Sequence, residues 1–196
     1  LTEHPELEFV QLQFNYLDYE DPVVESRKCY EVCVKHGKKV SVMEPVKGGT
    51  LAELPADAGA ILDALGGGSH ASYALRFAES FDNVFMVLSG MSTLEQMRDN
   101  LATMSDFRPL DDAELTAVHK VAATLRGKGA IPCTACRYCT AGCPAGIDIP
   151  SCFSCFNSKR MFGRPQSSER YAELTKNGSG PNDCIGCGQC EEACPQ

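Results

Sequence analysis

Residues 133–144 read Cys133-Thr-Ala-Cys136-Arg-Tyr-Cys139-Thr-Ala-Gly-Cys143-Pro144. The same spacing returns in residues 184–195, which read Cys184-Ile-Gly-Cys187-Gly-Gln-Cys190-Glu-Glu-Ala-Cys194-Pro195. Both stretches follow the pattern C-x2-C-x2-C-x3-C-P, with which bacterial-type ferredoxins bind iron–sulfur clusters. A single C-x2-C pair is a weak signal, but two complete runs in one chain are a strong one. The repeated run therefore predicts two 4Fe–4S clusters.

The ligands of each cluster follow from how such runs work. The first three cysteines bind one cluster, and the fourth, which precedes a proline, binds the other cluster. The predicted ligands of the first cluster are Cys133, Cys136, Cys139 and Cys194. The predicted ligands of the second cluster are Cys184, Cys187, Cys190 and Cys143.

Zinc and disulfides are the alternative uses of these cysteines. Structural zinc takes four ligands, typically as two C-x2-C pairs, and has no use for a third cysteine at the same spacing. A disulfide scaffold is typical of small secreted domains, and the sequence shows no signal peptide. Both alternatives therefore fit the spacing less well than clusters do.

The composition limits the domain count and the partners. The chain has 196 residues, of which 43% are hydrophobic, and a net charge of −8, which argues against nucleic acid or an anionic membrane as a partner. No apolar run reaches the length of a membrane-spanning helix. Of the 12 cysteines, only Cys29 and Cys33 precede residue 133. This unevenness predicts two domains, at 1–128 and 129–196, and metal ligation in a reducing cytoplasm. Because the chain begins with Leu1, we expect it to be a piece of a longer polypeptide.

Residues 1–108 alternate between strand and helix patterns. Strands are predicted at 8–16 and 39–43, and the apolar run 84–88 is typical of a strand that is buried on both faces. Asp21-Pro22 predicts the start of the first helix. Ser92 and Glu95 form the pattern of a capping box at the start of a later helix.

Such alternation predicts an α/β fold with parallel strands. Three strands make either a small independent domain or the last third of a closed barrel, which needs about 200 residues or more. Residues 151–162 of the cysteine region lack strand alternation, and a short helix is expected at 169–176. This predicts a helical two-cluster domain.

Three stretches resemble the later strands and loops of aldo/keto reductases. They are Gln11-Leu-Gln-Phe-Asn-Tyr16, Glu44-Pro-Val-Lys-Gly-Gly49 and Leu88-Ser-Gly-Met-Ser-Thr-Leu-Glu-Gln-Met-Arg-Asp-Asn100. The cysteine runs match the branch of this family that carries a C-terminal ferredoxin-like domain with two 4Fe–4S clusters. The resemblance implies the C-terminal part of a (β/α)8 TIM barrel, comprising its last three strands, followed by an all-helical two-cluster ferredoxin-like domain.

The resemblance also implies a site for NADP or NAD. Gln11 would face the nicotinamide, the loop 44–49 would run past the pyrophosphate, and residues 89–92 would hold the adenosine end. The residues implied to bind the cofactor are Gln11, Glu44, Pro45, Val46, Gly49, Ser89, Gly90, Ser92, Gln96 and Asn100. No residue matches the family's catalytic residues, which lie on earlier strands, so this chain alone is not expected to be a competent reductase.

The sequence thus favours a cytoplasmic iron–sulfur oxidoreductase whose clusters exchange electrons with a nicotinamide-binding barrel site. Its partner would be a redox protein or a small carbonyl substrate. A non-catalytic electron carrier and a zinc-stabilised interaction protein are the alternatives. Two further cysteine pairs, Cys29/Cys33 and Cys152/Cys155, have helical spacing and are predicted to be buried.

Overall fold

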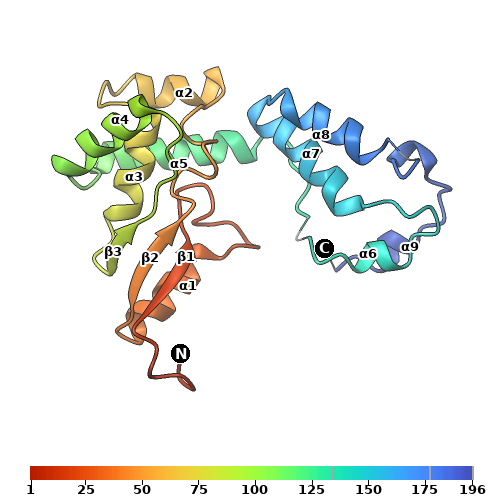
Figure 1. The fold of residues 1–196 in the computed structure, drawn as a ribbon, viewed down its shortest axis with the longest axis horizontal. Helices are drawn as coiled ribbons and strands as arrows, with labels where there is room; N and C mark the ends of the chain where they lie inside the picture. The colour runs from red at the N-terminus through yellow and green to blue at the C-terminus, as the bar shows by residue number, and fades with distance from the viewer. Residues whose placement is uncertain (134, 177, 196) are drawn as a thin grey trace. The chain divides into compact units, whose positions relative to one another are not determined.

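The computed structural model of the chain describes residues 1–133, 135–176 and 178–195. It divides into two compact units, Leu1–Thr124 and Leu125–Gln196. Each unit is described by itself, and Figure 1 shows the course of the chain through both.

The first unit contains a sheet of three parallel strands in the order β1-β2-β3. The strands are β1 (Phe9–Gln13), β2 (Lys39–Met43) and β3 (Val84–Val87). Val10 lies opposite Val40, which in turn lies opposite Val84. The parallel arrangement predicted from the alternation of strands and helices is confirmed.

Helices connect and follow these strands. They are α1 (Ser26–Lys35), α2 (Ala56–Asp63), α3 (His70–Glu79), α4 (Leu94–Ser105) and α5 (Asp112–Arg126). Helix α1 packs on β1 and β2, whereas α3 packs on β3, α2 and α4. The core is aromatic, because Phe14 and Phe77 are almost wholly buried and their ring centroids lie 6.0 Å apart. The Phe81 ring lies 4.8 Å from Phe14 and 5.3 Å from Phe77.

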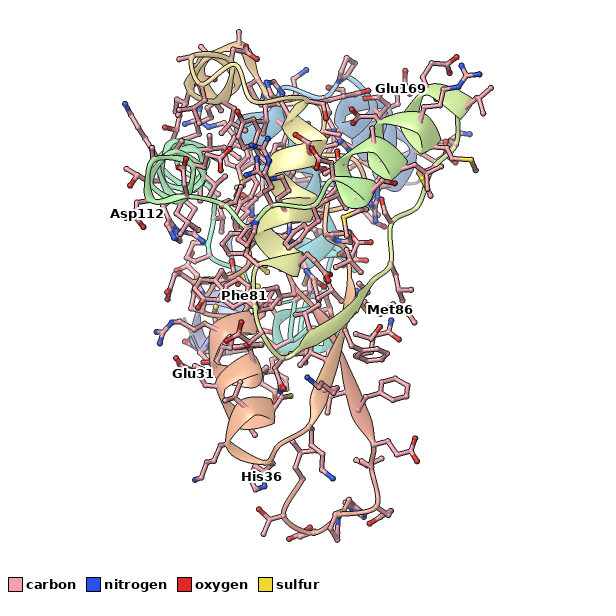
Figure 2. The ribbon with its side chains drawn as sticks, turned by 90° about the vertical axis from the view of Figure 1, so that its left-hand side faces the viewer. Glu31, His36, Phe81, Met86, Asp112 and Glu169 are labelled. Atoms are coloured by element: carbon pink, nitrogen blue, oxygen red, sulfur yellow. The ribbon has the colours of Figure 1, made fainter. Side chains whose placement is uncertain are left out.

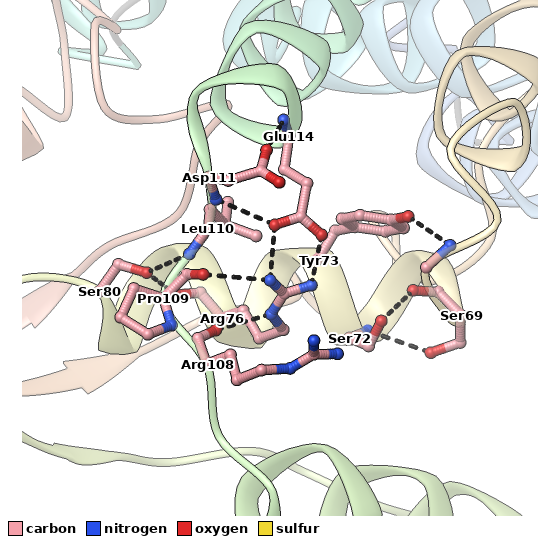
Figure 3. A network of polar contacts seen from close by, with 11 residues as sticks. Ser69, Ser72, Tyr73, Arg76, Ser80, Arg108, Pro109, Leu110, Asp111 and Glu114 are labelled. Carbon is pink, nitrogen blue, oxygen red and sulfur yellow. Dashed lines mark hydrogen bonds and ion pairs between the residues drawn. The ribbon is translucent and has the colours of Figure 1, made fainter.

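A buried ion pair ties α3 to the start of α5, as Figure 3 shows. Arg76 donates from Nη1 to Glu114 Oε1 at 2.7 Å and from Nη2 to Glu114 Oε2 at 2.5 Å. Its Nε donates to the carbonyl oxygen of Arg108. Glu114 also accepts from the backbone N–H of Asp111, whose carboxylate in turn accepts from the N–H of Glu114. The guanidinium is therefore satisfied from several sides in a place where an unpaired charge would be costly.

The prediction that residues 84–88 are buried on both faces is wrong. Phe85 and Met86 are each 46% exposed. Among the described residues β3 pairs only with β2, so its other edge has no neighbouring strand. Figure 2 labels Met86 on the side of the strands away from Phe81 and α1. On the exposed part of the sheet, the rings of Phe9 and Phe85 meet edge to face at 5.5 Å.

Two predicted helix starts are also wrong. Asp21 does not begin α1, because its carboxylate accepts from the N–H groups of Val23 and Val24 and closes a turn before the helix. Helix α4 is capped one residue later than predicted. Thr93 and Gln96 form its capping box, in place of Ser92 and Glu95.

The second unit is helical, as predicted, and its described residues form no strand. Its elements are α6 (Tyr138–Ala141), α7 (Ile149–Phe162), α8 (Gln166–Leu174), the 3-10 turn η1 (Pro181–Asp183) and α9 (Gln189–Glu192). Helix α7 packs against α8, and α6 packs against α9. Helix α7 begins at the N-cap Asp148 and ends at Gly163, whose φ of 65° is readily adopted by glycine. Across the described ranges, the longest apolar helical stretches fall short of what a membrane span requires.

Candidate iron–sulfur and nucleotide sites

The cysteines of the two runs gather around two cavities. The first cavity has a volume of about 400 Å³. The four cysteines predicted to bind the first cluster all line it, namely Cys133, Cys136, Cys139 and Cys194. Three of them come from the first run and the fourth comes from the end of the chain. The structure therefore brings together residues that are far apart in sequence.

The second cavity is much smaller, with a volume of about 40 Å³. Its lining includes the cysteines predicted for the second cluster, namely Cys143, Cys184, Cys187 and Cys190. Cys190 lines both cavities, and so does Ile149 at the start of α7. Each predicted ligand set contains two exposed cysteines, which are Cys136 and Cys194 in the first and Cys184 and Cys187 in the second.

The two cysteine runs share one backbone shape. Ala135 and Arg137 have positive φ angles of 55° and 66°. Gly186 and Gly188, which occupy the same places in the second run, have φ angles of 68° and 76°. Arg137 and Gly188 are also the N-cap residues of the short helices α6 and α9. Left-handed residues between the cysteines turn the chain sharply, which suits a loop that wraps a cluster.

The thiols are close enough to influence one another. Burial raises the pKa of the Cys139 thiol, and the nearby thiolates of Cys133, Cys136 and Cys190 raise it further against a backbone hydrogen bond that lowers it. No disulfide joins the cysteines within the described ranges. Over the same ranges, no three His, Cys, Asp or Glu side chains converge on a single metal position.

Part of the implied nucleotide site forms a pocket beside β3. Ser89, Gly90 and Asn100 line a cavity of about 570 Å³. Asn100 Nδ2 donates to Ser89 Oγ at 2.9 Å, which fixes the two side chains to each other. The rest of the lining is apolar, formed by Leu75, Val87, Leu88, Met91, Met97, Leu101 and Met104. This wall suits a flat apolar ring better than a phosphate.

Ser92 and Gln96 lie outside the lining of that pocket. Gln96 Oε1 accepts from the backbone N–H of Ser92 at 2.7 Å and from that of Thr93 at 3.2 Å. The Ser92 N–H is therefore already paired within the chain.

Of the other implied cofactor residues, Gln11 lies in the middle of β1 and the rest lie in the loop that follows β2. Gln11 donates from Nε2 to Met43 Sδ at 3.3 Å. In the following loop Glu44 and Gly49 have φ angles of 57° and 82°. Pro45 is buried and Val46 is half-buried in the same loop.

A polar network beneath this loop was missed by the sequence reasoning. Asp18 is 2% exposed and accepts from Lys47 Nζ at 2.5 Å. It also accepts from Gln13 and from Asn15, each at 2.8 Å. Asn15 Nδ2 donates in addition to the carbonyl oxygen of Glu44 at 2.9 Å. Several polar residues after a strand are the signal that could have revealed it, because barrel sites lie at that end.

The cysteines outside the runs differ in burial. Cys152 and Cys155 are 6% and 4% exposed, and Cys33 is 2% exposed, so their predicted burial is confirmed. Cys29 is exposed, and its predicted burial is wrong because it lies on the outer side of α1. Cys152 and Cys155 line a mainly apolar cavity of about 390 Å³ between α7 and α8.

Two family profiles match separate parts of the chain. The profile of the aldo/keto reductase family matches residues 1–123, and that of the 4Fe–4S dicluster domain matches residues 132–196. The second match favours iron–sulfur clusters over the zinc alternative. No curated protein shows a significant match.

Two solved structures of the aldo-keto reductase AKR11C1 from Bacillus halodurans are similar to the chain. The apo form is 21% identical with a TM-score of 0.48, over 61% of this chain and 46% of its own. The holo form is 22% identical with a TM-score of 0.46, over 61% of this chain and 45% of its own. The chain thus spans less than half the length of these relatives.

Proposed function

Because the chain belongs to the aldo/keto reductase family and continues into a 4Fe–4S dicluster domain, we propose that it is part of an iron–sulfur oxidoreductase. Two 4Fe–4S clusters in the second unit would exchange electrons with a site for NADP or NAD in the barrel. The second substrate would be a redox partner protein or a small carbonyl compound.

The main support for this proposal is that the fourth cysteine of each run lines the cavity of the other run. Cys194, from the second run, lines the cavity of Cys133, Cys136 and Cys139. Cys143, from the first run, lines the cavity of the second run. A pair of zinc sites built from C-x2-C pairs has no need of such an exchange.

The residues present fit the clusters by their donor set and by the first cavity. Four thiols surround each site, and thiolate is the ligand of 4Fe–4S clusters. The apolar side chains of Ile131, Pro132 and Phe153 line the first cavity and would limit the access of water. When bound, the clusters supply one-electron transfer, and burial and hydrogen bonds to sulfur set their potentials. The N–H of Gly186 makes one such contact, at 3.4 Å from Cys184 Sγ.

In the first unit the chain's own residues would orient the nucleotide. Gln11 would hold the nicotinamide amide, and the apolar wall beside Ser89 and Asn100 would accept the adenine ring. The network of Asp18, Asn15 and Lys47 holds the loop 44–49 in its left-handed conformation. The chain itself would therefore bind and position the nucleotide. The proton donor of the reaction would come from the earlier strands of the barrel, on which the family's catalytic residues lie.

Anaerobic purification followed by iron and sulfide analysis tests the cluster proposal. About eight iron and eight sulfide per chain are expected. Cys136→Ser and Cys187→Ser should each lose about half of the iron, since each removes a ligand of one predicted cluster. Cys29→Ser, an exposed cysteine outside both runs, is the matched control and should lose none. A colourless protein that contains zinc would overturn the proposal.

Equilibrium titration with NADP⁺ and NAD⁺ tests the nucleotide site. Binding that Gln11→Ala or Asn100→Ala weakens supports an oxidoreductase. An iron-loaded chain that binds neither nucleotide would instead support the non-catalytic electron carrier.

A further inference from the structure

The two cysteine runs share two left-handed positions, where the first run has Ala135 and Arg137 and the second run has glycines. Arg137 and Gly188 each follow the second cysteine of a run, and each adopts a left-handed conformation with φ angles of 66° and 76°. Glycine adopts this conformation freely, whereas other residues adopt it only at a cost in free energy. The second run shows that the turn itself needs no side chain. Ala135 adopts the same conformation without a functional side chain, so the backbone alone assigns no role, but Arg137 also brings a guanidinium to the lining of the first cavity.

The guanidinium of Arg137 is held at the first cavity. Arg137 lines that cavity together with its four cysteines. Its Nη2 donates to Asp148 Oδ2 at 3.0 Å. Asp148 is the N-cap of α7 and also accepts from the N–H and the hydroxyl of Ser151. The carboxylate that positions the arginine is thus itself fixed to a long helix.

The charges around the two cavities differ. Arg137 and Glu191 are the charged residues among the described lining of the first cavity, and Asp148 does not line it. Apart from its cysteines, the described lining of the second cavity consists of uncharged residues. Glu191 is exposed near the chain end, where solvent screens its charge. Arg137 is also exposed, with 57% of its side chain open to solvent, but its ion pair with the half-buried Asp148 holds the guanidinium at the cavity, so we expect its effect to exceed that of Glu191.

We propose that Arg137 raises the reduction potential of the cluster in the first cavity above that of the cluster in the second. The inference rests on the proposed function. Reduction adds one electron, taken from a one-electron redox partner protein, and breaks no bond. The added negative charge is stabilised by a nearby positive charge. An electron that enters the domain would then reside mainly on the cluster in the first cavity. Asp148 is the residue that positions the Arg137 guanidinium.

Redox titration of the cluster-loaded chain, followed by electron paramagnetic resonance, tests this inference. Arg137→Gly copies the second run, removes the charge and relieves the strained backbone. It should weaken the electron affinity of one cluster by about tenfold, which is about 59 mV for a one-electron couple. The potential of the other cluster and the thermal stability should not fall. Arg137→Lys should keep most of the wild-type potential.

The controls separate a charge effect from a structural one. Arg170→Gln removes one positive charge from exposed surface outside the cavity and should leave both potentials unchanged. Asp148→Asn keeps a good N-cap residue but removes the charge that neutralises Arg137, so it should raise the first potential. Unchanged potentials in Arg137→Gly and Asp148→Asn, with iron fully retained, would overturn the inference and leave the proposed function intact. Absence of clusters in the wild-type chain would overturn both.

Discussion

The hydroxyl of Tyr16 is buried without a hydrogen-bond partner among the described residues. Tyr16 is 1% exposed, and burial raises the pKa of its phenol above the ordinary value. An unsatisfied buried hydroxyl costs about 1–3 kcal/mol, and its removal leaves the ring in place. We therefore expect Tyr16→Phe to raise the free energy of unfolding by about 1 kcal/mol, measured by urea denaturation.

Tyr73 is the matched control because it is equally buried but its hydroxyl is used. Tyr73 accepts from the backbone N–H of Gly67 at 2.9 Å. Tyr73→Phe should lower the free energy of unfolding by about 1 kcal/mol. If both substitutions destabilise the chain equally, the Tyr16 hydroxyl has a partner, such as a buried water.

The ion pair of Arg76 and Glu114 makes stability depend on pH. The hydrogen bond from Arg76 is the main cause that lowers the pKa of Glu114, against burial that raises it. A carboxylate with a lowered folded pKa stabilises the fold above its unfolded pKa of about 4.3. This stability is lost as the pH falls from there through the folded pKa. Glu114→Gln should cost about 3 kcal/mol at pH 7, because Arg76 then stays buried without a counter-charge.

The pH series of denaturation midpoints gives the check. The difference between Glu114→Gln and wild type should shrink below pH 4, where the wild-type carboxylate is protonated. Glu31, labelled in Figure 2, pairs with Arg27 on the exposed side of α1 and provides the control. Glu31→Gln should hardly change the stability at any pH. A pH-independent deficit in Glu114→Gln would instead indicate a packing effect.

At the scale of the element, the start of α4 could be capped by either of two adjacent residues, Ser92 or Thr93. Thr93 Oγ1 accepts from the N–H of Gln96, whereas Ser92 offers its own N–H to the Gln96 side chain. Thr93→Ala should therefore cost about 1 kcal/mol, the usual loss for an N-cap. Ser92→Ala should cost almost nothing. Thermal denaturation of both variants measures this, and the reverse order would restore the capping box predicted from the sequence.

The adjacent residues explain why the sequence alone mispredicted this cap. Ser92-x-x-Glu95 and Thr93-x-x-Gln96 both satisfy the capping pattern, and the choice depends on where the chain leaves β3. Asp21 likewise has the chemistry of a cap but closes a turn instead. Strand identity was easier, because alternation and β-branched residues mark 39–43 within one segment. The exposure of Phe85 could not be predicted, since it depends on which strand lies beside β3.

At the scale of the whole molecule, long-range contacts set the limit of prediction. In runs with this spacing the fourth cysteine binds the cluster of the other run. The assignment of Cys143 and Cys194 to opposite sites could therefore be predicted before the fold was known. The charged wall of the first cavity could not be predicted. The pairing of Arg137 with Asp148 depends on where α7 begins relative to the first run. The network of Asp18 and Lys47 depends in the same way on the parallel pairing of β1 and β2.

The two units also differ in what can hold them folded. The first unit has an aromatic core around Phe14 and Phe77, whereas few apolar residues are buried among the described residues of the second unit, namely Leu125, Ile147, Pro150, Cys152 and Cys155. A domain of this size with a thin core usually relies on metal, because metal binding then contributes to the free energy of folding. Removal of iron by a chelator should therefore unfold α7 and α8 and leave β1–β3 folded.

Hydrogen exchange followed by mass spectrometry resolves the two units in one sample. In the iron-free chain, amides of α7 and α8 should lose their protection, while those of β2 at Val40 and Val42 should keep it. Cys136→Ser and Cys187→Ser should give intermediate protection, because each leaves one predicted site complete. Cys29→Ser, away from both runs, should exchange like wild type. Full protection of α7 and α8 without iron would mean that the helices are stabilised by their own packing, and the clusters would then serve electron transfer alone.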